Sequence, residues 1–191
     1  RTVIVPVTYA VILISSYAIL TSLSSSLGKF APEKALQTAV VTQQDLKQEY
    51  YKGNTFDIGE FDASYSSLAM KFPVATAAGL YRPFLWESNN AVMLLSGLEN
   101  ALIMFLTIWV IVAVKWRKLT YLIREYPIIL YSLVFSVLFA FMIGITTANF
   151  GALVRFKIPL IPLYMASIMV LHSHAVKVFF RKDRDRRFFW G

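Results

Sequence analysis

The sequence predicts an all-α fold, a polytopic transmembrane helical bundle of four spans, with a helical extracytoplasmic or interfacial segment between spans one and two. Hydrophobic residues make up 57% of the 191 residues and charged residues only 16%, whereas a soluble domain is nearer 45–50% apolar and about 25% charged. The apolar residues are also clustered into stretches of roughly 20 residues, the length that crosses a hydrocarbon core as a helix. We therefore expect an integral membrane protein.

Four stretches meet this length criterion: Val3–Leu23, Ala91–Val114, Ile128–Thr147 and Ile158–Val176. The first is too long for the core of a signal peptide and has no Ala-x-Ala-like cleavage site, so a transmembrane helix is expected there. Pro6, Pro159 and Pro162 lie at the starts of predicted spans, where helices tolerate proline best. The chain begins at Arg1 and runs straight into apolar sequence, which indicates either the C-terminal piece of a longer protein or N-terminal processing.

The basic residues set the expected orientation. Four of the nineteen lie in Lys115–Arg124 and six in Lys177–Arg187, and both clusters directly follow apolar spans. This is the positive-inside pattern, so both chain ends are expected in the cytoplasm. The same distribution explains the formal charge of +8 by contact with anionic membrane lipid rather than with nucleic acid. The expected regions are a first span (1–25), an extracytoplasmic segment (26–90), spans two to four (91–176) and a basic cytoplasmic tail (177–191).

The long outer segment is expected to be helical. Pro32 can open an amphipathic helix that runs to about Tyr51. Asp62 is a candidate N-cap for a short helix through Met70. The apolar stretch Phe72–Tyr81 is too short to cross a membrane and is predicted to be interfacial or re-entrant, beginning at Pro73 and ending at Gly79. The carboxylates Asp57, Glu60 and Asp62 have a spacing typical of turns, although a general base among them is an alternative.

Glu99 is the one acidic residue inside a predicted span. It lies eight residues into the second span, roughly 12 Å along the helix axis. An ionised group there costs roughly 2.5–3.5 kcal/mol on insertion scales, so a partner or a protonated state is expected. The sequence favours a structural pair with Asn100, Arg82 or Arg155 over a carboxylate that faces a substrate cavity.

Arg155 and Lys157 lie at the outer lip of the fourth span, where the positive-inside pattern does not explain them. Arg can bind phosphate through paired hydrogen bonds and Lys as a point charge, so a phosphate site is one interpretation. Snorkelling of both side chains to lipid head groups is the other. Asn149 and Gly151 would allow an irregular backbone close to a bound group.

Arg82 lies near the membrane in the other outer segment. It is predicted either to converge with Arg155 on one anion or to pair with Glu87, and the pairing is favoured. His172 and His174, two residues apart, do not share a helix face, so no metal site is expected.

The sequence offers no catalytic motif. It has no cysteine, which excludes disulfides, thiol catalysis and Cys-based zinc sites. Nucleophile, phosphate-loop, zinc and dinucleotide signatures are also absent, so no cofactor and no metal are predicted and the catalytic residues are unknown.

Arg155-Phe-Lys-Ile-Pro159, followed by Leu-Ile-Pro162 and an apolar helix, resembles a motif near the end of bacterial GT-C-type glycosyltransferases, which use polyprenyl-phosphate-linked sugars. The segment Arg82-Pro-Phe-Leu-Trp-Glu87 is similar to membrane proteins of surface-polysaccharide assembly. The resemblance implies that Arg155 faces the lipid-linked phosphate, and it implies the same less strongly for Lys157. It also implies that the spans lie in the inner membrane of a bacterium. The early outer loop that carries the catalytic acid in such enzymes is not present in this chain.

Three functions are therefore expected in order of preference. The first is a part of an envelope-glycan glycosyltransferase or polymerase that acts on a polyprenyl-phosphate-linked glycan, with Arg155, Lys157, Arg82 and Glu99 as substrate-binding residues. The second is a non-enzymatic membrane subunit that binds other membrane subunits. The third is a transporter with Glu99 as its coupling site, which four spans without broken-helix repeats make less favourable.

Overall fold

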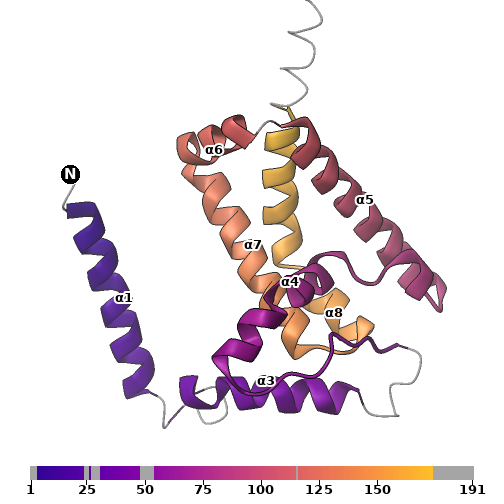
Figure 1. Cartoon of the computed structure of the whole chain (residues 1–191), viewed down its shortest axis with the longest axis horizontal. Coiled ribbons are helices and arrows are strands. Elements are labelled where there is room, and N and C mark those ends of the chain that lie inside the picture. Colours follow the sequence, from indigo (N-terminus) through magenta and orange to yellow (C-terminus); the bar gives the residue numbers. More distant parts are fainter. Residues whose placement is uncertain (1–3, 24–25, 27–30, 48–53, 115, 174–191) are drawn as a thin grey trace, which may run out of the picture.

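The computed structural model describes residues 4–23, 26, 31–47, 54–114 and 116–173. Within these residues the regular elements are all helices, joined by a single isolated bridge between Thr55 and Asn149. The prediction of an all-α fold is confirmed. Figure 1 shows the helices, which are α1 (Ile4–Ser22), α3 (Pro32–Leu46), α4 (Tyr65–Tyr81), the short 3₁₀ helix η3 (Leu85–Glu87), α5 (Ala91–Ala113), α6 (Trp116–Glu125), α7 (Pro127–Thr146), α8 (Phe150–Phe156) and a final helix (Leu160–Ser173).

Two of these helices, α5 and α7, are long and apolar enough to cross a membrane. A third span results if α8 and the final helix, which meet at a bend of 65°, are counted as one. Two to three candidate spans support the prediction of a membrane protein. The first predicted span corresponds to α1, which has 19 residues, and its crossing of a membrane stays a prediction.

The helices are distributed between two ends of the molecule. Figure 1 shows α3 and α8 at the end where α7 finishes, and α6 crosswise at the opposite end, where α5 finishes. The predicted outer connections thus fall at one end and the described part of the basic connection 115–124 at the other. This arrangement agrees with the predicted topology, while the side of the membrane that each end faces stays a prediction. The predicted tail, 177–191, lies outside the described residues.

The tightest helix contact joins α4 to α7. Gly79 of α4 lies against the backbone of Ala140, and Gly144 of α7 lies against the backbone of Ala75. Both alanines are fully buried. In both places a Cβ atom would overlap the facing carbonyl oxygen, so only glycine allows this approach. Small residues that bring two backbones together are typical of helix packing in membranes.

The structure corrects the predicted boundaries in the outer segment. Instead of one helix through Met70 and another from Pro73, a single helix, α4, runs through Pro73. Its N-cap is Ser64, whose side chain accepts a hydrogen bond from the backbone of Ser67, and not Asp62. The reason is tertiary: packing along α7 outweighs the local preference of proline for a helix start. The amphipathic helix predicted from Pro32 is α3, which ends at Leu46, and residues 48–53 lie outside the description.

The fourth predicted span begins with a separate short helix. The residues between the third and fourth predicted spans, 148–157, are expected to form a short outer connection, and α8 occupies most of it because the Asn149 side chain caps its first turn. The chain then turns at residues 157–159 before the final helix. Pro159 explains this break, since it has no backbone N–H to donate and disfavours a helical residue before it.

Candidate functional site

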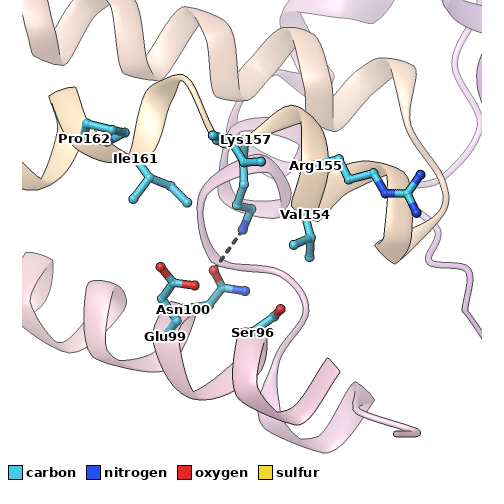
Figure 2. A pocket seen from close by; sticks show the side chains of 9 residues that line it. Ser96, Glu99, Asn100, Val154, Arg155, Lys157, Ile161 and Pro162 are labelled. Atoms are coloured by element: carbon cyan, nitrogen blue, oxygen red, sulfur yellow. Dashed lines mark hydrogen bonds between the residues drawn. The ribbon is translucent and has the colours of Figure 1, made fainter. Parts of the chain in front are cut away.

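A cavity of about 330 Å³ lies between α5 on one side and α8, the turn and the final helix on the other. It brings together three of the four predicted site residues: Glu99, Arg155 and Lys157. Arg82 is not part of its lining. Figure 2 shows the cavity, which is lined by Ser96, Glu99, Asn100, Val154, Arg155, Lys157, Ile158, Ile161 and Pro162.

Lys157 lines this cavity, but its side chain is buried and its ammonium is bonded within the protein. Its side chain is only 2% exposed. The ammonium donates to the carbonyl oxygens of Leu80 (3.3 Å) and Arg82 (2.7 Å) and to Oδ1 of Asn100 (2.9 Å). An ammonium has three N–H donors, so all of them are engaged. A buried charge is tolerated when it is fully hydrogen-bonded in this way, and these contacts join the turn after α8 to residues 80–82 and to α5.

Asn100 holds the same segment from α5, and Lys157 and Asn100 together are called the clamp. Asn100 is also 2% exposed, and while its Oδ1 accepts from Lys157, its Nδ2 donates to the carbonyl oxygen of Pro83 at 3.1 Å. Lys157 and Asn100 together satisfy three carbonyls of the segment Leu80–Pro83 and tie it to α5. The connection between α4 and η3 is thereby fixed beside the cavity.

Arg82 lies in this connection and does not share the cavity with Arg155. Its Nε lies 3.3 Å from Oε1 of Glu87, which confirms the pairing that the sequence favoured. The guanidinium also lies 5.1 Å from the ring centre of Phe56 and 5.8 Å from that of Phe84, and donates to the carbonyl oxygen of Asp57. Its charge is therefore already engaged within the outer segment.

Glu99 is exposed and lines the cavity from α5. In Figure 2 its carboxylate points across the cavity towards Ile161 and Lys157. The structural ion pair that the sequence favoured is not formed: among the described residues, no ion pair joins Glu99 to Arg82 or Arg155. Asn100, the third candidate partner, uses its Oδ1 for Lys157 instead.

Arg155 is exposed in the last turn of α8. Figure 2 shows its guanidinium extending away from Glu99 and Lys157, on the far side of Val154. Within the described ranges it forms no ion pair. Because it lines the cavity and its charge is not neutralised by a protein partner, it is the group most available to an anion.

The start of α8 is ordered rather than irregular, contrary to the expectation for Asn149 and Gly151. Oδ1 of Asn149 accepts from the backbone of Gly151 (2.8 Å) and of Ala152 (3.2 Å). The backbone of Phe150 donates to Asn54 (2.8 Å), and that of Phe56 donates to Ala148 (2.9 Å). Two segments that are distant in sequence are thus joined at this point.

Of the outer carboxylates, that of Asp57 behaves as a turn residue, as its spacing predicts. Oδ1 of Asp57 accepts from the backbone of Gly59, whose φ of 83° requires glycine. The same carboxylate pairs with Lys47, and that hydrogen bond is the main reason why the pKa of Asp57 is lowered. Across the described part of the chain, no three His, Cys, Asp or Glu side chains gather as metal ligands would. His174 lies outside it.

Sequence reasoning missed a buried chain of hydroxyl groups beside the clamp. The Tyr164 hydroxyl lies 3.0 Å from that of Tyr81 and 3.0 Å from that of Thr107. These contacts join α4, α5 and the final helix. A signal was present, since Asn100 and Thr107 are seven residues apart and thus share one face of a helix. Polar residues on one face of an apolar helix indicate the side that packs against protein.

Comparison with protein families, with curated proteins and with solved structures gives no match for this chain. Its function is therefore argued from the residues of the cavity.

Proposed function

We propose that this chain is part of a bacterial envelope protein that binds a polyprenyl-phosphate-linked glycan during polysaccharide assembly. The observation that carries the proposal is Arg155, an exposed arginine at the edge of the cavity between α5 and the bent helix pair, which forms no ion pair with any residue that the structure describes. Its planar guanidinium can bind two oxygens of a phosphate at once. The motif around it, Arg155–Pro159, supports the same ligand through its resemblance to polyprenyl-phosphate-dependent glycosyltransferases.

The surroundings of Arg155 suit a phosphate that carries a long apolar chain. Val154, Ile158 and Ile161 contribute apolar walls to the cavity. Ile158 is 63% exposed and Phe156 is 53% exposed, so the apolar surface continues out of the cavity on the side of the turn. A prenyl chain can lie along this surface within the bilayer while the phosphate stays at the lip.

The two basic residues of the motif have different tasks in this proposal. Arg155 binds the phosphate directly, and Lys157 holds the connection Leu80–Pro83 and the wall of the cavity in position. Glu99 repels the phosphate and so confines it to the Arg155 side of the cavity. Its carboxylate can accept hydrogen bonds from hydroxyl groups of the glycan. No catalytic group is assigned.

The binding step is tested with the full chain in lipid nanodiscs and farnesyl diphosphate as the probe. Charge-assisted hydrogen bonds contribute about 1.5–3 kcal/mol, so we expect Arg155→Ala to weaken binding roughly 10- to 100-fold. Arg155→Lys should recover part of the affinity, because it restores the charge without the paired geometry. Lys34→Ala, at an exposed cation of α3, is the matched control and should bind as wild type does.

The cellular role is tested with the same variants in the native host. Arg155→Ala should abolish the surface glycan while the amount of inserted protein stays normal, and Lys34→Ala should leave the glycan intact. Normal glycan in cells that carry Arg155→Ala would refute the proposed function.

A further inference from the structure

A second cavity, of about 530 Å³, lies where α5 and α8 begin. Both cavities are formed by the same two helices. The first is lined by residues 96, 99 and 100 of α5 and by 154 and 155 of α8, and the second by residues 90–93 beside α5 and by 149 and 151 beside α8. The distance from Asn90 to Ser96 along a helix is roughly 9 Å. The second cavity therefore lies beyond the first, towards the starts of α5 and α8, and the two cavities together are called the groove.

Three asparagines line this second cavity: Asn54, Asn90 and Asn149. Two of them are oriented by helix capping. Oδ1 of Asn90 accepts from the backbone of Met93 (2.9 Å), and Oδ1 of Asn149 accepts from Gly151 and Ala152. With the oxygen of each amide held on its own helix, the Nδ2 group is the free end.

These amide donors are unused within the protein. Neither Nδ2 of Asn90 nor Nδ2 of Asn149 has a hydrogen-bond partner among the described residues. Neither Nδ2 atom is among the buried polar atoms of the described residues that lack a partner, so both donors are accessible from the cavity that their residues line. A donor that is accessible from a cavity and unused within the protein is available to a ligand.

The backbone around Asn54 and Asn149 is held in place before any ligand binds. Asn54 and Asn149 are brought together by the bridge between Thr55 and Asn149 and by the hydrogen bond from Phe150 to Asn54. The rings of Phe56 and Phe150 stack beneath this contact, with their centres 5.2 Å apart. A site whose donors are held in place before binding loses less entropy when a ligand arrives.

The second cavity has no charged residue in its lining, in contrast to the first. Amide donors beside the apolar side chains of residues 91–93 suit a neutral ligand rich in hydroxyl oxygens, such as a sugar. We propose that this cavity is the subsite for the sugar head group of the ligand whose phosphate Arg155 binds. This inference rests on the proposed function and adds the location and the chemistry of the glycan end.

The test removes the donors and keeps the helix caps. Asp and Ser are both good N-cap residues, so Asn90→Asp with Asn149→Asp, and separately Asn90→Ser with Asn149→Ser, leave the caps in place. The Ser pair adds no charge and so controls for repulsion in the Asp pair. Ser64→Asp exchanges one good N-cap residue for another at the start of α4, away from the cavity, and is the matched control.

The probes are farnesyl diphosphate and its derivatives linked to glucose, galactose or N-acetylglucosamine, measured with the full chain in nanodiscs. We expect at least one sugar-linked probe to bind wild type more tightly than farnesyl diphosphate does. Both double variants should weaken that probe roughly tenfold, as the loss of one or two hydrogen bonds implies. Binding of farnesyl diphosphate itself should change less than twofold in the Ser pair.

Free sugars distinguish the two sources of such a ligand. If a free sugar binds wild type at millimolar concentration and loses binding in the Ser pair, the subsite takes a separate acceptor sugar; if only the linked probe responds, it takes the lipid-linked sugar. The inference is overturned if every sugar-linked probe and every free sugar binds the double variants as tightly as it binds wild type. Failure of the proposed function has a different signature, which is unchanged binding of farnesyl diphosphate in Arg155→Ala.

Discussion

Lys157 and Arg155 lie two residues apart in the sequence, yet the structure gives them opposite environments. The turn after α8 directs Lys157 into the protein, where it is 2% exposed, and leaves Arg155 exposed. From the sequence, both were candidates for the same phosphate. Their separation could not be foreseen, because it depends on the carbonyls of Leu80 and Arg82, more than 70 residues away in the chain.

The burial of Lys157 leads to a prediction about stability. Lys157→Met removes a donor that serves three acceptors, two of them in buried hydrogen bonds, and each buried acceptor left unsatisfied costs about 1–3 kcal/mol. We therefore expect the melting temperature of the detergent-solubilised chain to fall by several degrees, measured by tryptophan fluorescence. Arg155→Met, at the exposed neighbour, should change the free energy of unfolding by no more than about 0.5 kcal/mol. Equal melting temperatures for Lys157→Met and wild type would show that the clamp does not stabilise the fold.

At the scale of elements, the sequence predicts the helices well and their ends less well. Apolar length alone locates α5 and α7 to within one residue of the structure at either end. The same reasoning divides α4 at Pro73, because local rules for proline do not include the contact with α7. It also misses α8, whose cap at Asn149 was interpreted as irregular backbone. Local chemistry therefore predicts where helices form, and tertiary packing decides where some of them continue.

The contact between α4 and α7 is tested by adding a single methyl group. Gly144→Ala places a Cβ atom on the carbonyl of Ala75, and backbone atoms cannot move aside as a flexible side chain can. Overpacking of this kind costs about 1–3 kcal/mol, so we expect a lower melting temperature and faster digestion of α4 by trypsin at Lys71. The matched change Gly151→Ala meets only the side-chain oxygen of Asn149, at 3.1 Å, and should be tolerated. If both variants melt alike, the close approach of the two helices is not needed for stability.

At the scale of the whole molecule, the distribution of charge and the arrangement of the helices both divide the molecule into two ends. The described part of the basic connection 115–124 lies at the end with α6, and α3 and α8, together with the groove between α5 and α8, lie towards the other. The positive-inside pattern predicts that the first end faces the cytoplasm. Both proposed subsites would then face the outer side, where lipid-linked glycans are polymerised in envelope assembly. The sidedness of the molecule thus decides whether the proposed ligand can reach its site.

The absence of cysteine from the chain allows a direct test of this topology. Single cysteines replace exposed residues at each end: Lys34 in α3 and Asp62 before α4, against Tyr121 in α6. A membrane-impermeant maleimide should label Lys34→Cys and Asp62→Cys in intact spheroplasts, because both lie in the predicted outer segment. Tyr121→Cys should react only after the membrane is permeabilised. The reverse pattern would place the groove on the cytoplasmic side, and a ligand assembled on the outer leaflet could not then enter it.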